Sequence, residues 1–356
     1  MKREFLMLAK SLTPDSRIGG WLLSEKLDGV RCFWDGGITK GMLCTDVPWA
    51  NTAKDARLLN VPKATGLWTR YGKPIYAPQW FTDALPPVFL DGELYAGRGG
   101  FQKVTSTVKD LIPGEGWRDI KYMVFDSPPV HVIFNDGVID NINYKKKLTS
   151  VGAWVKDKGG KSLVGTLTPF IQTLSHLSAT FKVKDAPWQV HHQIQLPGSN
   201  EKALEEVRYH ANWICERGGE GVMIRRAWSP WRPERSSDLL KLKPFQDSEG
   251  TVIGYTWGRE TDKGSKLLGL MGNLVVEWEG KTFELSGFTN EERRLFRNGS
   301  EGAAYAEGAA HPGERCSEEI TSISFPIGTK VTFKYRELTD AGIPKEARYW
   351  RKHDLV

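Results

Sequence analysis

Two short apolar runs flank a charged segment near the start of the chain. Residues 21–23 and 32–34 each predict a buried strand, and Asp28-Gly29 between them is typical of a turn into the second strand. Lys26 therefore falls at a strand end, in a half-buried cleft where desolvation and neighbouring cations lower the pKa of an amine towards nucleophilic use. The alternative is an ordinary Asp-Gly hairpin that carries a surface lysine, which is a common arrangement.

Two later strand patterns carry acidic and aromatic residues. Asp91 and Glu93 lie on one predicted strand, and paired acids at a strand end commonly hold a hydrated Mg²⁺, although a turn with a solvated carboxylate fits equally well. Residues 121–126 predict a buried strand whose rings, Tyr122 and Phe125, are placed to flank a base, while core packing is the more ordinary role of each. Neither pattern identifies a site by itself.

A helix and two strands follow in the second half of the chain. Apolar positions recur at helical spacing over residues 201–217, and the glycines at 218–219 end this predicted helix. The next strand opens with Glu220, and a later one places Lys241 and Lys243 on one face by the period-two rule. Two ammonium groups on one face repel each other unless an anion lies between them, so this pair favours a phosphate-binding role.

The stretch at residues 244–250 marks the predicted domain boundary. We expect one domain over residues 1–245 and a second over residues 246–356. The second contains many short strand-like runs, which is the pattern of a small barrel such as an OB-fold. These runs lie at residues 251–257, 272–278, 281–285 and 330–335.

Three segments depart from these patterns. Residues 40–67 lose the strand alternation and mix basic residues with Trp49, which predicts a surface excursion, either a DNA-facing loop or a solvated loop without that role. Residues 298–322 are rich in Gly, Ala, Glu and Ser and predict a mobile insertion. His191-His192 lacks the spacing of a metal site, so we assign it a structural role.

Composition narrows the class of protein. The 356 residues hold 49 Lys and Arg against 43 Asp and Glu, and the net charge of +6 suits a polyanionic partner without identifying one. The start of the chain lacks the apolar run of a signal peptide, and no stretch reaches the apolar length of a membrane span, so we expect a soluble, cytoplasmic protein. The cysteines form no close pairs, which predicts neither disulfides nor a zinc site: Cys32, Cys44, Cys215 and Cys316.

Taken in chain order, these segments resemble the motif series of the ATP-dependent DNA ligases, in particular the compact bacterial and phage type. The segments that match are residues 26–31, 69–72, 90–93, 124–126, 220–224, 240–243 and 342–351. The resemblance covers nearly the whole chain except residues 40–67, about 129–200, and 298–322. It implies an α+β fold, in which an ATP-grasp-like nucleotidyltransferase domain of antiparallel sheets with flanking helices precedes an all-β OB-fold domain. Only 25 residues precede Lys26, so we expect no DNA-binding domain ahead of it.

The resemblance also implies a site and its partners. Lys26 would be the nucleophile that takes AMP from ATP, Glu93 and Glu220 would bind Mg²⁺ (with Mn²⁺ as a substitute), and nicked double-stranded DNA would be the substrate of a monomeric enzyme. The residues implied in nucleotide binding are Glu25, Arg31, Arg70, Glu93, Phe125, Lys241, Lys243 and Arg351. Two departures stand out: Thr69 replaces the usual serine, and the last motif ends differently, which leaves open whether Arg348, Arg351 or Lys352 carries its role.

Four rival functions share parts of this pattern. An RNA ligase or a GTP-using capping enzyme has the same lysine motif, but the basic C-terminal barrel disfavours the first and the match between motifs disfavours the second. A non-catalytic nick-binding module would not need Lys26, Glu93, Glu220 and the Lys241/Lys243 pair together. An NAD⁺-dependent ligase is disfavoured because its NAD-recognition domain and zinc cysteines do not occur in the sequence.

Overall fold

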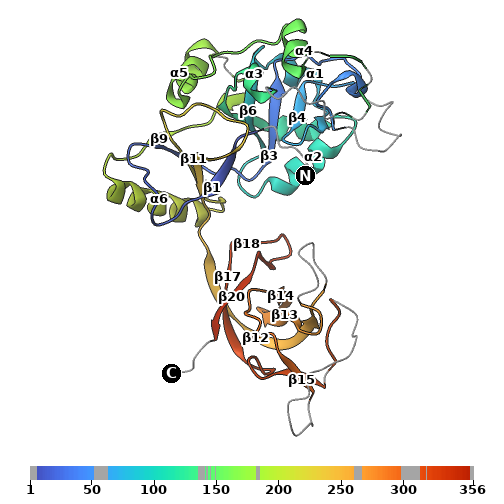
Figure 1. Ribbon diagram of the computed structural model, residues 1–356, viewed down its shortest axis with the longest axis vertical. Coiled ribbons are helices and arrows are strands. Elements are labelled where there is room, and N and C mark those ends of the chain that lie inside the picture. Colours follow the sequence, from blue (N-terminus) through green and yellow to red (C-terminus); the bar gives the residue numbers. More distant parts are fainter. Residues whose placement is uncertain are drawn as a thin grey trace. The chain divides into compact units, whose positions relative to one another are not determined.

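The computed structural model describes most of the chain, and the chain divides into two compact units, Met1–Lys243 and Pro244–Val356 (Figure 1). This division lies two residues before the boundary predicted from the sequence. The described residues are 6–51, 63–134, 141, 143–144, 146–148, 150–181, 185–259, 267–297, 313–317 and 319–352.

The first unit contains two sheets. One has five strands in the order β1-β11-β10-β2-β9, and the other has six in the order β5-β4-β3-β6-β7-β8. The five are β1 (Leu8–Ser11), β2 (Leu22–Glu25), β9 (Ile194–Gln195), β10 (Val222–Arg225) and β11 (Arg235–Leu242). The six are β3 (Val30–Asp35), β4 (Leu67–Thr69), β5 (Pro74–Ile75), β6 (Phe89–Tyr95), β7 (Lys121–Asp126) and β8 (Trp188–Val190).

The prediction of antiparallel sheets is wrong for two of the strand pairs. β1 pairs with β11 and β7 pairs with β8 in parallel, while the other neighbours are antiparallel. Both parallel pairs join segments that are far apart in sequence, and a long connection returns the chain to the same end of a sheet as readily as to the opposite end. Local patterning therefore carries no information on their direction.

The segment that carries Lys26 is the crossover between the two sheets. β2 pairs with β10 and β9, whereas β3 pairs with β4 and β6. The two strands around Asp28-Gly29 are therefore not hydrogen-bonded to each other, and the hairpin alternative is wrong. The predicted strands on either side are confirmed, and Lys26 follows directly after the end of β2.

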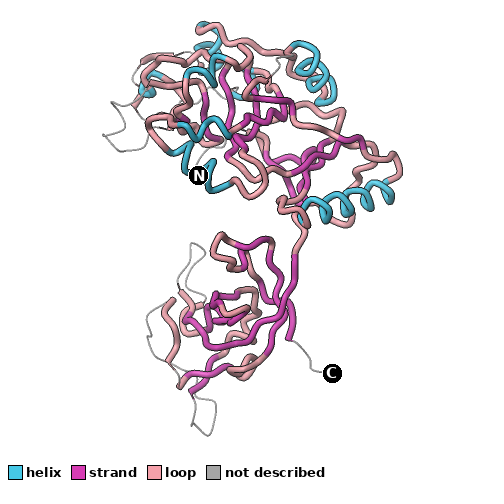
Figure 2. The backbone as a smooth tube through the Cα atoms, turned by 180° about the vertical axis from the view of Figure 1, so that it is seen from behind, coloured by secondary structure: helices cyan, strands magenta, loops and turns pink. Residues whose placement is uncertain are grey.

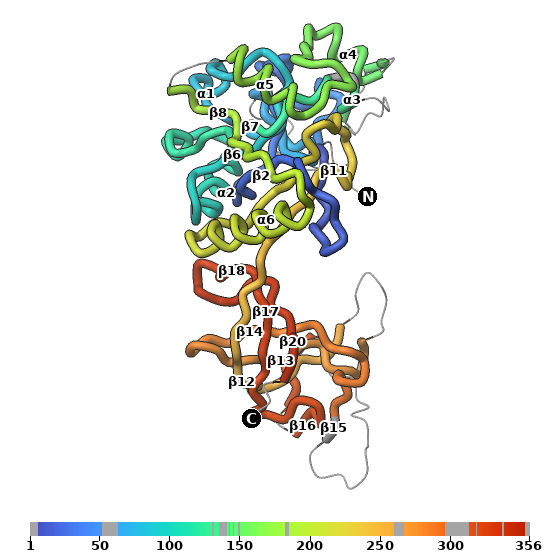
Figure 3. Tube along the Cα trace, turned by 90° about the vertical axis from the view of Figure 1, so that its left-hand side faces the viewer, coloured from blue at the N-terminus to red at the C-terminus, as the bar shows by residue number. Residues whose placement is uncertain are grey.

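Helices pack against both faces of the six-stranded sheet: α1, α2 and α5 on the face of Cys32 and Trp34, and α3 and α4 on the opposite face. Cys32 and Trp34 of β3 face a core that includes Phe81 of α1, Val104 of α2 and Leu177 of α5, and Figure 3 shows α5 beside β7 and β8. The helices of the first unit are α1 (Gln79–Asp83), α2 (Phe101–Lys109), α3 (Val130–Ile133), α4 (Val151–Asp157), α5 (Phe170–Thr180) and α6 (Asn200–Cys215), with short 3₁₀ segments at Cys44–Asp46 and Glu115–Asp119.

The other face of this sheet is covered in part by a segment predicted to be a surface excursion. Trp49 is fully buried, its ring stacks on Phe134 at 4.6 Å and meets Trp68 edge-on at 5.8 Å, and Val47 is buried with it. The prediction for residues 40–67 is therefore wrong around Trp49, because an indole of this size gains more from a two-sided core than from solvent. Residues 52–62 lie outside the described part of the chain.

The predicted amphipathic helix is confirmed as α6. Its buried positions, Ala203, Val207, Ala211 and Ile214, pack on β2 and β10 of the five-stranded sheet. Gly218 then adopts a φ of +77°, the left-handed conformation that ends helices and that glycine takes without steric cost. This turn delivers the chain to Glu220, next to the end of β2.

The described part of the second unit is all-β, as the sequence predicts, and Figure 2 shows strands and loops there without a helix. Its main sheet has the order β14-β13-β12-β17-β20. The strands are β12 (Gln246–Trp257), β13 (Met271–Trp278), β14 (Lys281–Leu285), β15 (Leu295–Arg297), β16 (Ile320–Ser322), β17 (Lys330–Tyr335), β18 (Glu337–Leu338), β19 (Pro344–Lys345) and β20 (Arg348–Lys352).

The second unit also tests two smaller predictions. β16 lies inside the segment predicted as a mobile insertion, so residues 320–322 are strand, while residues 298–312 and 318 lie outside the described part. All four cysteines are free thiols, as predicted. Of the helices that the structure describes, none joins bilayer-crossing length to the apolar character that such a crossing needs.

Candidate active site

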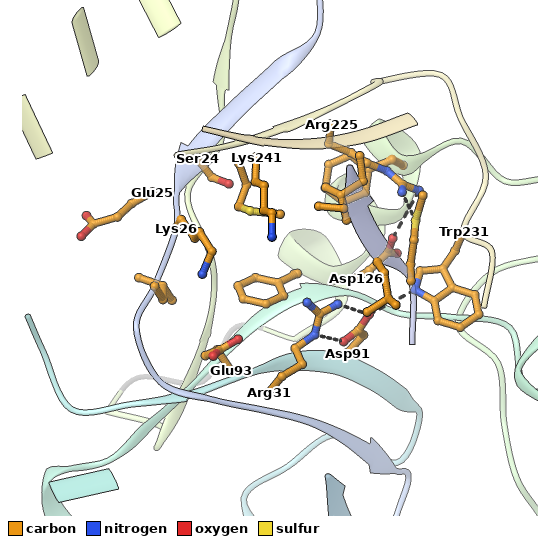
Figure 4. A pocket seen from close by; sticks show the side chains of 18 of the residues that line it. Ser24, Glu25, Lys26, Arg31, Asp91, Glu93, Asp126, Arg225, Trp231 and Lys241 are labelled. Atoms are coloured by element: carbon orange, nitrogen blue, oxygen red, sulfur yellow. Dashed lines mark hydrogen bonds and ion pairs between the residues drawn. The ribbon is translucent and has the colours of Figure 1, made fainter. Parts of the chain in front are cut away.

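A cavity of about 280 Å³ is lined by residues of both sheets of the first unit (Figure 4). Every site residue predicted in this unit lines the cavity except Glu220. Glu220 forms ion pairs with two of the lining residues, Lys26 and Lys243. Its charged, polar and aromatic lining residues include Ser24, Glu25, Lys26, Arg31, Arg70, Asp91, Glu93, Phe125, Asp126, Arg225, Trp231, Lys241 and Lys243. Residues up to 219 positions apart in sequence therefore meet around one space.

Lys26 is fixed at its main chain and held at its side chain. Its amide N–H donates to the carbonyl of Gly221 at 2.8 Å, which continues the alignment of β2 with β10. Its ammonium forms an ion pair with one oxygen of Glu220, and the other oxygen of that carboxylate pairs with Lys243. Glu220 is the most buried of the three, with 7% of its side chain exposed against 22% and 18% for the two lysines.

Lys241, near the end of β11, and Lys243, just after it, have the electrostatic character that the sequence predicts. Figure 4 shows the side-chain nitrogens of Lys26 and Lys241 directed into the same space, and Lys243 lies beside them through Glu220. Three lysines around one cavity create a strong field for an anion, and the single carboxylate of Glu220 cannot balance three charges. The cavity is therefore suited to a phosphate group.

Arg31 is held by Asp91 rather than by a ligand. Its Nε and Nη2 donate to the two oxygens of Asp91 at 2.7 and 2.8 Å, and the indole N–H of Trp231 donates to the same carboxylate at 3.1 Å. Asp91 is almost fully buried, and it lies in the middle of β6 rather than at a strand end. Both oxygens of Asp91 accept hydrogen bonds, so Asp91 orients the guanidinium of Arg31, and Glu93 of the same strand is left as the candidate metal ligand.

Glu93 differs from Asp91 in having no such clamp. Burial raises the pKa of its carboxyl to about 7, while the charges of Arg31 and Lys26 oppose that rise. A carboxylate in this state gains from any further cation that enters the cavity. Among the described residues, no group of three or more His, Cys, Asp or Glu side chains is arranged to hold a metal alone. Glu93 and Glu220 do match the donor set of Mg²⁺, which takes one or two carboxylates, waters and substrate phosphates.

The two aromatic residues of β7 have different roles. Tyr122 is fully buried, and its hydroxyl donates to the carbonyls of Cys32 and Leu90 at 3.2 and 3.0 Å, so the core role is confirmed for this ring. Phe125 is only partly buried and lines the cavity. The guanidinium of Arg31 lies 5.0 Å from its ring centroid. The Phe125 ring is therefore the flat apolar surface that a base requires.

Glu25 lies differently from its prediction as a nucleotide ligand. Its carboxylate binds Arg98, and Figure 4 shows it directed away from the nitrogens of Lys26 and Lys241. Its main-chain carbonyl is 2.8 Å from Nε2 of His191, a ring that is buried and whose pKa burial lowers. His191 thus has the structural role that the sequence suggests.

A second, more open cavity adjoins the first at residues 26–31 and contains Arg70 and Lys73. Arg70 stacks on Tyr71, with 4.7 Å from the guanidinium carbon to the ring centroid. Arg351 belongs to the second unit, where it lies exposed on β20 with its guanidinium 4.9 Å from the ring centroid of Trp350. The role of Arg351 at the nucleotide stays a prediction.

The floor of the main cavity contains residues that the sequence reasoning missed. Arg225 is 4% exposed, donates from Nη2 to the carbonyl of Pro230 at 2.9 Å and lies 3.9 Å from Asp126. Burial raises the pKa of Asp126 to about 6, and the charge of Arg225 opposes that rise. The available signal was a charged residue at the end of an apolar strand, since both residues are the last of β7 and β10.

Comparison with known proteins adds four findings. Residues 263–352 match the family model described as DNA ligase OB-like domain. A DNA ligase from Haemophilus influenzae is 27% identical over 336 residues, which are 94% of this chain and 87% of the relative. A solved structure from a structure–function analysis of Lig E DNA ligases is 25% identical, has a TM-score of 0.62 and covers 98% of both chains. Another, named Pmar-Lig_PreS3, shares the fold at 16% identity and a TM-score of 0.58, over 98% of this chain and 67% of its own.

Proposed function

We propose that this chain, which is similar to DNA ligases over nearly its whole length, is an ATP-dependent DNA ligase that seals nicks at the cavity around Lys26 through a lysyl-AMP and a DNA-adenylate intermediate. The observation that carries the assignment is the position of Lys26. It lies on the crossover between two sheets, with Glu220 and Lys243 on one side and Arg31 and Glu93 on the other. A nucleophile, an anion-attracting field and two carboxylates thus meet in one small space.

In the first step Lys26 acts on ATP. Its Nζ attacks the α-phosphorus, the bond from that phosphorus to the bridging oxygen breaks, and pyrophosphate leaves with the bond's electrons. The amine must first lose its proton and separate from Glu220, and the positive charges of Lys241 and Lys243 favour that loss. The same two cations stabilise the charge that builds on the phosphate.

Glu93 and Glu220 are the residues that would hold Mg²⁺ in this site. A bound Mg²⁺ would neutralise part of the negative charge of the phosphates. Glu220 pairs with both Lys26 and Lys243, so a cation bound to this carboxylate would weaken both ion pairs at once. The readiness of the nucleophile would then depend on the cation that accompanies the substrate.

The remaining residues position the substrates. Phe125 offers its face to adenine, and Arg31, already oriented by Asp91, reaches the ribose or the 5′-phosphate of the nick with a guanidinium suited to bidentate contacts. Arg70 is placed for the same phosphate in the adjoining cavity. AMP then passes from Lys26 to the 5′-phosphate, and the 3′-hydroxyl displaces AMP to close the strand. Arg351 would orient pyrophosphate during the first step.

The nucleotide and the nucleic acid are tested together. Protein with Mg²⁺ and α-labelled ATP should become labelled, and α-labelled GTP should not, with sealing of a nicked DNA duplex but not of a nicked RNA duplex. Label from GTP would indicate a capping-type enzyme, and preferential sealing of RNA would indicate an RNA ligase. We also propose a monomer that acts in the cytoplasm. Its mass in solution, with and without nicked DNA, tests the first part, and cell fractionation tests the second.

A further inference from the structure

Arg98 connects three segments that meet at the candidate active site. It lies in the turn between β6 and α2, flanked by Gly97 and Gly99, whose φ angles of +87° and +74° allow the tight reversal. Its Nε and Nη2 donate to the two carboxylate oxygens of Glu25 at 2.8 and 2.9 Å. Its Nη1 donates to the carbonyl of Arg217 at 3.4 Å. One guanidinium thus binds β2 and the end of α6 from a loop of the other sheet.

Each of these segments carries a residue of the proposed chemistry. Glu25 directly precedes Lys26, Arg217 is three residues before Glu220, and Arg98 itself is five residues after Glu93. A fourth segment contacts the same part of β2, since Nε2 of His191 lies within hydrogen-bonding distance of the main-chain carbonyl of Glu25. The hydrogen bonds of Arg98 therefore connect the segments that carry Lys26, Glu93 and Glu220. Arg98 itself does not line the cavity that these three residues surround.

The Glu25–Arg98 pair packs against α6 and the turn that follows it. A Cβ atom added at Gly219 would lie 2.3 Å from Cγ2 of Ile214 and 3.0 Å from Oε1 of Glu25, so this glycine allows the turn to lie close to both the helix end and the carboxylate. The Arg98 guanidinium also lies 5.6 Å from the ring centroid of Trp213 on α6. Arg98 and Glu25 are about one quarter exposed, so the strength of the pair comes from its two parallel hydrogen bonds rather than from burial.

We propose that Arg98 is a positioning residue, which acts through Glu25 to hold Lys26 in line with Glu220 and Glu93. This inference rests on the proposed function. Lys26 lies on a crossover whose flanking strands do not pair with each other, and residues 27–29 after it lie between the ladder of β2 and that of β3. A displacement of about 1 Å at a reacting group costs up to roughly a hundredfold in rate.

The proposal predicts a selective effect on the steps in which Lys26 is bonded. Arg98→Ala should slow lysine adenylylation at saturating ATP by about tenfold or more, with little change in the ATP concentration at half-maximal rate. Sealing of a nick that already carries AMP does not use Lys26, and it should stay within about twofold of the unaltered protein. A variant that merely folds poorly would lose both activities together.

Companion variants isolate the contact itself. Glu25→Gln should reproduce the adenylylation defect, the double variant should be no slower than either single one, and Arg98→Lys should recover part of the rate because it keeps the charge without the bidentate geometry. Arg217→Ala is the matched control: its side chain also lies on Trp213, at 4.3 Å, and its main-chain carbonyl remains. That variant should adenylylate normally.

The outcomes distinguish the proposed function from the positioning role of Arg98. Absence of label on the unaltered protein would overturn the proposed function and the role of Arg98 with it. Normal adenylylation by Arg98→Ala, in a protein that otherwise becomes labelled, would overturn the positioning role alone. Additive losses from Arg98→Ala and Glu25→Gln would also contradict it, because two partners of one contact cannot be lost twice.

Discussion

A substitution at Glu220 distinguishes two roles for this residue, because the two roles predict opposite changes in the rate of adenylylation. Its carboxylate binds Lys26 and Lys243 at once and is 7% exposed. Glu220→Gln keeps the shape of the side chain but removes its charge. If Glu220 only held the Lys26 ammonium in its protonated form, the change would free the amine and speed adenylylation. If Glu220 also organises Mg²⁺ and the phosphates, the change slows adenylylation.

The size of each effect follows from the contacts. Loss of one transition-state electrostatic contact costs about a hundredfold in rate, or about 2.7 kcal/mol in activation free energy. Loss of the carboxylate also leaves two partly buried ammonium groups close together. The free energy of unfolding should fall by about 2 to 3 kcal/mol, between the value for exposed pairs and that for fully buried ones. We therefore expect Glu220→Gln to adenylylate at least about a hundredfold more slowly, and Glu93→Ala to lose a similar factor.

The assay is single-turnover labelling of the protein with α-labelled ATP over a range of Mg²⁺ concentrations, with urea unfolding of each variant alongside. Asp83→Asn is the control, because Asp83 also pairs with a lysine, Lys40, but at an exposed site away from the cavity. It should adenylylate like the unaltered protein. Near-normal or faster labelling by folded Glu220→Gln at saturating Mg²⁺ would refute the metal-organising role.

Three further results are expected. Arg351→Ala should lose lysine adenylylation yet seal nicks that already carry AMP; equal loss in both assays, together with a shallower salt dependence of DNA binding, would instead indicate a backbone contact. Phe125→Ala should raise the ATP concentration at half-maximal adenylylation by about tenfold, the scale of one lost stacking contact. An unchanged concentration would show that adenine does not stack on Phe125. Burial raises the pKa of Asp35 to about 6, so the folded state holds this proton more tightly than the unfolded state. The stability that this proton gives is present below about pH 4 and lost by about pH 6, roughly 3 kcal/mol in all. Because burial also raises the pKa values of Glu93 and Asp126, urea unfolding should show a loss of stability with rising pH in both proteins, but a loss smaller by about 3 kcal/mol in Asp35→Asn; an equal loss in the two would contradict this prediction.

The sequence predicts those parts of the site that lie in contiguous motifs. Lys26, Arg31, Glu93 and Phe125 each lie in a short apolar context that predicts a strand, and the structure brings them to one cavity. The motifs do not predict which charged side chains form ion pairs with each other. The Lys26–Glu220 pair joins positions 194 residues apart, and periodicity carries no information about contacts at such separations.

Three residues show what the sequence could not resolve, each for a separate physical reason. The pattern around Asp91 is the same whether a carboxylate on a strand binds a metal or a guanidinium, and only the position of Arg31 decides. The sequence indicated no role for Arg98, because its contact with Glu25 spans 73 residues. Trp49 was placed at the surface because its neighbours are basic, yet packing of the indole between two aromatic rings outweighs that context.

The central claim is that Lys26 forms a covalent bond with AMP. The most direct measurement is the mass of the intact protein after incubation with ATP and Mg²⁺, followed by mapping of the modified peptide. The account predicts one added AMP, located on Lys26, that is absent from Lys26→Ala and present in Lys40→Ala, which alters a lysine also bound to a carboxylate. An adduct that persists in Lys26→Ala, or that maps to Lys241 or Lys243, would contradict it.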